Sequence, residues 1–131
     1  MREILFRGKK KVYNKWVYGW YCGKILNSDM SSTEESSQII DANTLYWHTC
    51  EPESVGQFTG LTDTNGKKIF EGDILKRTNG NKYLWYVDFK ISAFCANQTN
   101  CNYSCELGEL LETIEVEVIG NIHDNPELLE D

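Results

Sequence analysis

Residues 55–75 read VGQFTGLTDTNGKKIFEGDIL, and this stretch decides the fold class. Two short apolar runs flank the turn sequence DTNG at residues 63–66. Asn and Gly tolerate the positive φ angles that tight hairpin turns need. The stretch therefore predicts a β-hairpin whose first strand ends near Leu61 and whose second begins at Lys68. Gly72 predicts a sharp corner or bulge before a third strand.

Alternation of apolar and polar residues with a period of two recurs along the chain and is typical of β-strands. The clearest cases are residues 12–22, 38–40, 44–48, 84–90 and 113–119. In residues 84–90 we expect Trp85, Val87 and Phe89 to point inward. Several short strands separated by Gly- and Asn-containing turns predict a mainly β protein. It would form either a small SH3-like barrel or paired short antiparallel sheets.

Helical periodicity is confined to two short segments. Residues 106–112 (ELGELLE) are long enough for two turns, although Gly108 costs about 1 kcal/mol there. Near the end of the chain, Asn125 followed by Pro126 predicts a short C-terminal helical turn with Asn125 as its cap. The polar, Ser-rich residues 27–37 predict a loop.

The length of 131 residues allows one domain or two small lobes. We expect an N-terminal β lobe at residues 1–52, with a basic, aromatic-rich hairpin and the Ser-rich loop. A barrel-like lobe at residues 53–131 would contain the 55–75 stretch, and the two lobes could also form one intertwined domain. No apolar run approaches the ~20 residues that cross a bilayer, and the basic start is not followed by a signal-peptide core. These features predict a cytoplasmic protein.

Three motifs carry a family resemblance. Residues 55–75 resemble the signature of the YopX family of phage and prophage proteins. The start REILFR (residues 2–7) is similar to that family's usual start, and EVIGNIHDNPELL (residues 117–129) is similar to its closing motif. The resemblance implies a phage or prophage origin in a bacterial host and implies no activity, because the family is uncharacterised. Residues 22–50 and 91–106 match no family pattern.

We expect the signature to be chiefly structural. Its marker residues are Phe58, Gly60, Asn65, Gly66, Phe70, Glu71, Gly72 and Asp73. Its expected core residues are Phe58, Leu61, Ile69, Phe70, Ile74 and Leu75. Asp63 is interpreted as a turn residue whose carboxylate accepts nearby backbone N–H groups. Glu71 and Asp73 are expected to bond to N–H groups at the corner, the alternative being a carboxylate site.

The net charge of −7 hides a gradient along the chain. Residues 1–24 hold seven Lys or Arg against one Glu, a local charge of +6, whereas residues 106–131 hold nine acids and no Lys or Arg. Opposite ends attract each other either within one chain or between copies. Short β modules also leave unpaired strand edges. We therefore expect a small homo-oligomer, or a complex with a phage or host protein.

The basic, aromatic N-terminal segment is the alternative binding site. Its candidate residues are Arg7, Lys9, Lys10, Lys11 and Lys15, interleaved with Tyr13, Trp16, Tyr18 and Trp20. Cations for phosphates and rings for stacking are what a single-strand nucleic-acid platform uses. The competing interpretation is a core strand, which we favour because exposed Trp is uncommon. Any nucleic-acid binding is expected to be weak and salt-sensitive.

The cysteines are the remaining chemical lead. Cys95, Cys101 and Cys105 lie close in sequence, and His48 with Cys50 offers further zinc ligands. The usual spacing of two residues between ligand cysteines is absent, and five cysteines cannot form a complete disulfide framework. We expect no metal and no cofactor. No nucleophile elbow, P-loop or dinucleotide motif is present, so no catalytic residue is assigned and the protein is expected to be non-enzymatic. A metal or catalytic protein built on the cysteines or on the Glu71/Asp73 corner is the second alternative.

Overall fold

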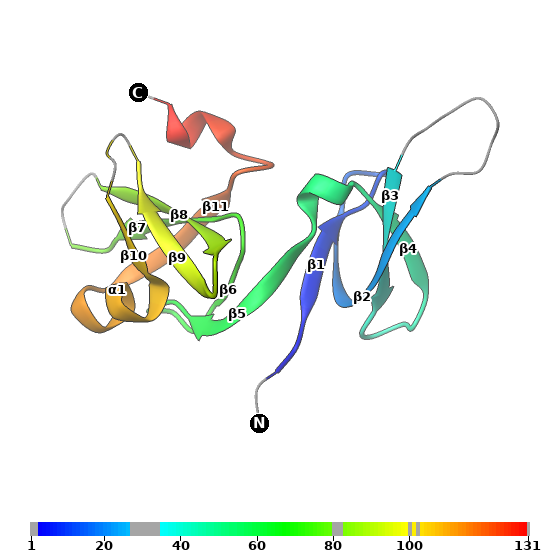
Figure 1. Cartoon of the computed structure of the whole chain (residues 1–131), viewed down its shortest axis with the longest axis horizontal. Coiled ribbons are helices and arrows are strands. Elements are labelled where there is room, and N and C mark those ends of the chain that lie inside the picture. The colour runs from blue at the N-terminus through cyan, green and yellow to red at the C-terminus, as the bar shows by residue number, and fades with distance from the viewer. Residues whose placement is uncertain (1–2, 27–34, 80–82, 100, 102, 131) are drawn as a thin grey trace. The chain divides into compact units, whose positions relative to one another are not determined.

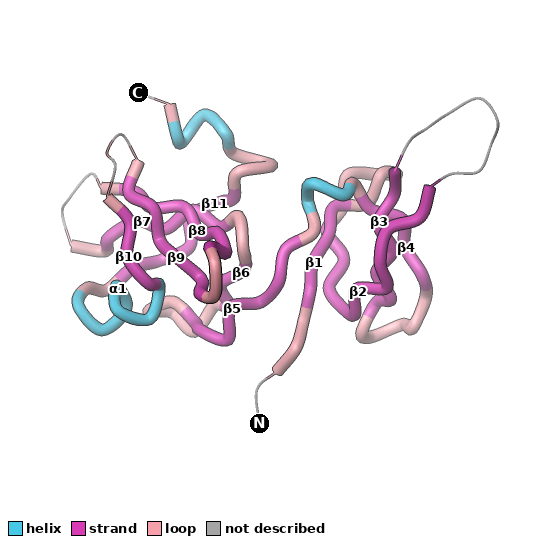
Figure 2. The backbone as a smooth tube through the Cα atoms, viewed as in Figure 1, coloured by secondary structure: helices cyan, strands magenta, loops and turns pink. Residues whose placement is uncertain are grey.

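A computed structural model of the chain describes residues 3–26, 35–79, 83–99, 101 and 103–130 (Figure 1). The described residues are mainly β-strand, as predicted, with one short α-helix and two 3-10 helices (Figure 2). In chain order the elements are β1 (Phe6–Lys9), β2 (Trp16–Leu26), β3 (Glu35–Asp41), β4 (Trp47–Cys50), η1 (Pro52–Ser54), β5 (Gly56–Thr62), β6 (Lys68–Phe70), β7 (Asp73–Arg77), β8 (Leu84–Lys90), β9 (Ala93–Gln98), β10 (Ser104–Glu106), α1 (Leu107–Thr113), β11 (Val116–Asn121) and η2 (Pro126–Leu129).

The chain divides into two compact units, Met1–Phe58 and Thr59–Asp131, whereas the sequence analysis divided it after residue 52. The later division follows from strand pairing, because the first residues of β5 belong to the sheet of the N-terminal unit: Gln57 lies opposite Phe6 of β1. Of the two expected architectures, the paired antiparallel sheets are confirmed. Among the described strands no closed barrel forms, since one sheet ends at β4 and β6 and the other at β10 and β11.

The N-terminal unit is built on the antiparallel strands β4-β3-β2-β1. Its core is small and consists of Val17, Ile39 and Cys50, with Phe6 and Val55 packed against them. Gly19 of β2 lies so close to β3 that an added Cβ would collide with the carbonyl oxygen of Ile40. The β1–β2 hairpin closes with the Lys10 N–H donating to the carbonyl of Lys15 at 2.8 Å. In its tip, Tyr13 and Asn14 both adopt positive φ, at 70° and 51°.

The end of β1 also joins the free side of β4. Lys10 forms a bridge with Cys50, the Lys11 N–H donates to the Thr49 carbonyl at 3.1 Å, and the Glu51 N–H donates to the Lys9 carbonyl at 2.9 Å. The second half of β4 is therefore hydrogen-bonded on both sides. This pairing brings the Lys10–Lys11 segment next to the β3–β4 hairpin.

The C-terminal unit contains the second part of β5, strand β6 and the sheet β10-β9-β8-β7-β11. Its core cluster comprises Ile69, Leu75, Trp85, Val87, Ala96, Leu107, Leu110 and Val116. The predicted signature core is confirmed for Phe58, Ile69, Phe70, Ile74 and Leu75, all of which are buried, while Leu61 is partly buried. The expectation for Phe89 is wrong, because its side chain is 51% exposed and contacts Phe94 near the end of the β8–β9 hairpin.

The corner at Gly72 has the predicted backbone. Gly72 has φ of 89°, which L-residues with side chains rarely adopt. Its N–H donates to the Val87 carbonyl at 2.8 Å, and its own carbonyl accepts the Ile122 N–H at 2.8 Å. The Asp73 carboxylate accepts the Phe70 N–H at 2.7 Å, the corner role that was expected of it. The corner thus joins β6 and β7 to β8 and to the segment after β11.

Both expected helical segments exist, and the cap of the second is a correction. Helix α1 starts one residue after the predicted start, and Pro126 occupies the start of η2. The Asn125 side chain does not cap η2; its Oδ1 accepts the Asn121 N–H at 3.2 Å and packs against Gly120. Of the Ser-rich loop, residues 27–34 lie outside the described residues, and the rest is the start of β3, where Ser37 pairs with Lys24. No helix in the described part of the chain has the length and apolar character to cross a membrane.

Candidate functional site

The register of β2, β3 and β4 gathers aromatic side chains on one face of the N-terminal sheet. Trp20 lies opposite Ile40, and Ile40 lies opposite Trp47 on the next strand. Directly paired residues share a face, and so do residues two apart along a strand. Tyr18 therefore joins this row. We call Tyr18, Trp20, Ile40 and Trp47 the aromatic face.

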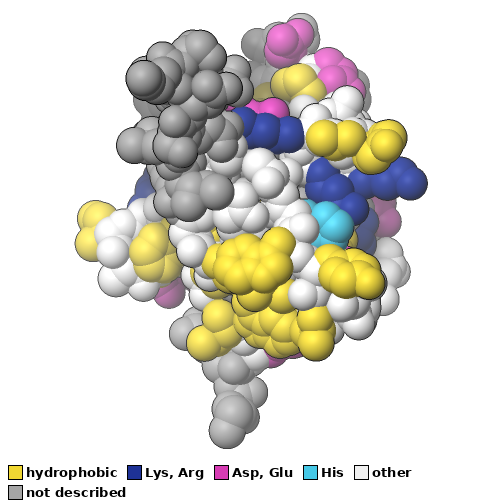
Figure 3. All heavy atoms as spheres, turned by 90° about the vertical axis from the view of Figure 1, so that its right-hand side faces the viewer, with side chains coloured by type: hydrophobic (Ala, Val, Ile, Leu, Met, Phe, Trp, Pro, Cys, Tyr) yellow, Lys and Arg dark blue, Asp and Glu magenta, His cyan; other side chains and the backbone are white. Residues whose placement is uncertain are grey.

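The aromatic face is largely exposed, which corrects the expectation of a core strand. The exposed fractions of Tyr18, Trp20 and Trp47 are 43%, 47% and 62%. The other parity of β2 supplies the core residue, Val17, which is 2% exposed. Both parities of this strand carry bulky apolar residues, so alternation alone could not show which side turns inward. Space-filling atoms show hydrophobic side chains gathered here beside a histidine and Lys or Arg side chains (Figure 3).

The β3–β4 hairpin extends the apolar surface next to the aromatic face. Leu45 and Tyr46 in its tip are 64% and 71% exposed. Asp41 organises this tip by accepting the N–H groups of Asn43 and Thr44 at 2.7 and 3.2 Å. These bonds favour the ionised carboxylate and lower the pKa of Asp41 below its usual value. Sequence reasoning read the segment as a strand and so missed this surface.

The predicted basic residues divide between the side of the aromatic face, where Arg7 lies opposite Tyr18, and the neighbourhood of β4. Arg7 is 5% exposed, and its guanidinium carbon lies 4.7 Å from the ring centroid of Trp16. Lys9 pairs with Trp16 and so shares its side of the sheet, while Lys10 and Lys11 lie beside β4. Lys15 is exposed at the base of the hairpin. Arg7 thus packs against the Trp16 ring, and the lysines form a basic border of the aromatic face.

The described cysteines do not assemble into a ligand set. No group of three or more His, Cys, Asp or Glu that could hold a metal ion is found within the described ranges. All five cysteines are free thiols: Cys50 is buried, Cys95 and Cys105 are half-buried, and Cys22 and Cys101 are exposed. Burial raises the pKa of the Cys50 thiol to about 11 and also raises that of Cys105. Burial thus disfavours the thiolate form of both side chains.

Two acids of the signature, Asp63 and Asp73, accept backbone N–H groups. Asp63 accepts the N–H groups of Asn65 and Lys67 with one carboxylate oxygen, each at 2.9 Å, as the turn interpretation predicted. Asp88 lies on β8, where its carboxylate accepts the Asn97 side-chain amide at 2.9 Å. The Asn97 Oδ1 in turn accepts Lys90 Nζ. Asp63 and Asp88 therefore have separate polar partners.

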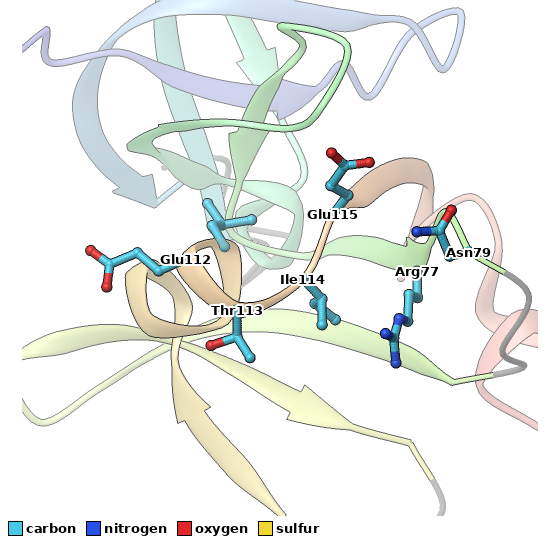
Figure 4. Close-up of a pocket in the computed structure, with 7 residues that line it drawn as sticks. Arg77, Asn79, Glu112, Thr113, Ile114 and Glu115 are labelled. Atoms are coloured by element: carbon cyan, nitrogen blue, oxygen red, sulfur yellow. The ribbon is translucent and has the colours of Figure 1, made fainter.

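A hollow of about 450 Å³ lies in the C-terminal unit, beside the end of α1. It is lined by Arg77, Asn79, Leu111, Glu112, Thr113, Ile114 and Glu115. In Figure 4 the side chains of Arg77, Thr113 and Ile114 point to one side of the ribbon, whereas those of Glu112 and Glu115 point away from it. The lining is therefore of mixed character, and its two glutamates point away from Arg77 and Ile114. No sequence motif marked it.

These observations define a two-unit, mainly β protein with an exposed aromatic face on its N-terminal sheet. The chain belongs to the YopX protein family, which its sequence matches over residues 5–130. Its fold is similar to the crystal structure of protein EF1440 from Enterococcus faecalis, with 24% identity, a TM-score of 0.56, and 99% of this chain and 100% of that chain covered. It is also similar to the crystal structure of protein YopX from Bacillus subtilis, with 18% identity, a TM-score of 0.55, and 100% and 98% covered. No curated protein matches the sequence.

Proposed function

We propose that this protein is a non-enzymatic accessory protein of phage or prophage origin that acts in a bacterial cytoplasm. It acts by binding other proteins, and its first partner is a second copy of itself. The observation that carries the proposal is the exposure of Trp47, Trp20 and Tyr18 on one sheet face. Trp and Tyr are the residues that most often dominate binding energy in protein interfaces. Burying such side chains is favourable through the hydrophobic effect, and the surplus over the cost of association appears as affinity.

Charge favours a second copy as the occupant. Residues 1–58 hold seven basic and seven acidic residues, whereas residues 59–131 hold six basic and thirteen acidic ones. The described positions that share the aromatic face by register, on β1 to β4, include no Asp or Glu. A neutral, aromatic unit with basic border residues complements the acidic unit of another copy.

The proposal is tested by sedimentation velocity of the whole chain and of a Trp47→Ser, Trp20→Ser double variant. The wild type is expected to sediment as a concentration-dependent oligomer and the variant as a monomer. Tyr103→Ser is the matched control, because Tyr103 is also an exposed aromatic residue, at 56%, but lies in the other unit. A wild type that is monomeric at every concentration, or a double variant that associates like the wild type, contradicts the proposal.

A second candidate function is single-strand nucleic-acid binding on the same face. The exposure of Tyr18 and Trp20 favours it, together with Lys9 on their side of the sheet. The excess of acid in the whole chain opposes it, so binding is expected to be weak and to fall steeply with salt. Quenching of tryptophan fluorescence by oligo-dT is the test. Lys9, Lys10 and Lys11 changed to Glu should abolish quenching, and quenching that persists at roughly 200 mM salt would contradict the expected weak, lysine-driven mode.

A further inference from the structure

The hollow beside α1 and the aromatic face of the N-terminal unit are complementary in chemistry. The hollow offers a cation from Arg77 within a mainly polar lining, and smaller apolar contacts from Leu111 and Ile114, which also pack against the core. The aromatic face offers Trp47, the most exposed of its rings. An aromatic ring seated in a pocket is the usual form of an interface hot spot, and a guanidinium is attracted to the face of an indole ring.

We propose that the hollow lined by Arg77, Leu111 and Ile114 receives Trp47 of a second copy of this chain. The inference rests on the proposed self-association and specifies where the aromatic face binds. A different patch on each partner makes the contact heterologous, so each copy carries one donor surface and one acceptor surface. Such a contact builds rings or open chains of molecules and not an isologous dimer.

The charges beside the two surfaces match in sign. Glu112 and Glu115 line the hollow and are exposed, and in Figure 4 their side chains point away from those of Arg77 and Ile114. Lys10 bridges to Cys50, three residues along β4 from Trp47, a separation of about 10 Å in a strand. Lys15 lies beside Lys10, because its carbonyl accepts the Lys10 N–H at the base of the β1–β2 hairpin. When Trp47 occupies the hollow, the lysines beside β4 face the glutamates at its border, and this attraction weakens with salt.

Because the contact joins two different surfaces of the molecule, a complementation experiment can test it. One variant carries Lys10→Glu and Lys15→Glu, and a second carries Glu112→Lys and Glu115→Lys. Sedimentation at roughly 50 mM salt should show each variant alone as a monomer, because like charges then face each other. An equimolar mixture should regain assembly with alternating variants, because both contacts between unlike variants pair opposite charges, one in the original arrangement and one in the exchanged arrangement. The variant with all four changes should regain the wild-type assembly.

Matched controls separate local charge from net charge. Glu127→Lys with Glu130→Lys makes the same change in net charge at exposed residues of the η2 region, and Lys67→Glu with Lys76→Glu does so for exposed lysines. Both should associate like the wild type. Arg77→Ala keeps the glutamates and removes the cation under the ring, and it should weaken association by up to about tenfold.

The outcomes distinguish this inference from the proposed function on which it rests. If the Trp47 and Trp20 variant loses association while the Glu112 and Glu115 variant keeps it, the aromatic face binds elsewhere, and the hollow is not its acceptor. If the mixture stays monomeric although the wild type associates, the heterologous contact is likewise overturned. If the wild type is monomeric, both proposals fail together.

Discussion

The carboxylate of Asp63 accepts the backbone N–H of Val118 at 2.9 Å, although 55 positions separate the two residues in the sequence. Asp63 is in the turn of the β5–β6 hairpin, and Val118 is in β11. The same carboxylate accepts two N–H groups within its own turn through its other oxygen. One buried side chain therefore links the family's signature to its closing motif.

We predict that Asp63→Asn destabilises the protein by about 2–3 kcal/mol. Asparagine keeps one acceptor oxygen but presents an amide donor either to the Val118 N–H or to the two turn N–H groups. Urea unfolding followed by circular dichroism measures the change. Asp41→Asn is the control, because Asp41 is the acceptor of an exposed turn and Asn serves well there. An Asp63→Asn midpoint equal to that of the wild type would show that the long-range bond is dispensable.

Gly72→Val should destabilise by more than about 1 kcal/mol, because the β-branched residue must adopt φ near 89°. Gly108→Ala should have the opposite sign and stabilise by up to about 1 kcal/mol. Gly108 lies in α1, and an added Cβ there meets no atom within 4 Å. Thermal unfolding of both variants is the measurement. Equal unfolding temperatures for the Gly72 variant and the wild type would refute the need for glycine at the corner.

Phe70→Ala and Phe58→Ala should each cost about 3–5 kcal/mol, because the rings are 3% and 6% exposed and their loss leaves cavities. Phe89→Ala removes the same atoms from a ring that is half exposed and should cost much less. Denaturant titration of the three variants provides the comparison. Similar losses for all three would mean that the signature rings are not specially packed.

Raising the pH above 9 should destabilise the protein through Cys50. The pKa of this thiol is raised by burial from 9.0 to about 11, so the folded state prefers the protonated form. The stability this provides is complete below pH 9 and is lost as the pH rises through 11. Cys50→Ala should lack this loss of stability.

The burial of Cys50 also predicts an order of thiol reactivity. In the wild type, exposed Cys22 and Cys101 should react with a thiol reagent at pH 8 well before Cys50. A fast reaction of Cys50 in the folded protein would contradict its burial.

The purified protein is predicted to carry no stoichiometric zinc, because the cysteine spacing lacks the close pairs that zinc sites use. Elemental analysis after dialysis is the measurement. One zinc per chain that disappears when Cys101 and Cys105 become Ser would overturn the prediction, and its retention in a Cys22→Ser control would place the ion at the C-terminal cysteines.

The sequence by itself determined the mainly β class, the family, the 63–66 turn and the corner at Gly72. These depend on local rules: alternation with a period of two, turn chemistry, and the φ angle that only glycine adopts easily. Local rules also identified five buried residues of the signature, because its strands carry apolar residues bounded by clear turns.

Tertiary structure alone decided which side of β2 faces the core. Trp16, Tyr18 and Trp20 on one parity and Val17 and Tyr21 on the other are both apolar sets, so the pattern has no preferred side. The choice comes from β3 and β4, which place Ile39 and Cys50 against Val17 and leave Trp20 and Trp47 outside. The hollow at Arg77 and Ile114 likewise needs two segments 37 positions apart, and no local signal encodes such an approach. Strand pairing between distant residues is a property of the folded chain, and it created both candidate binding surfaces.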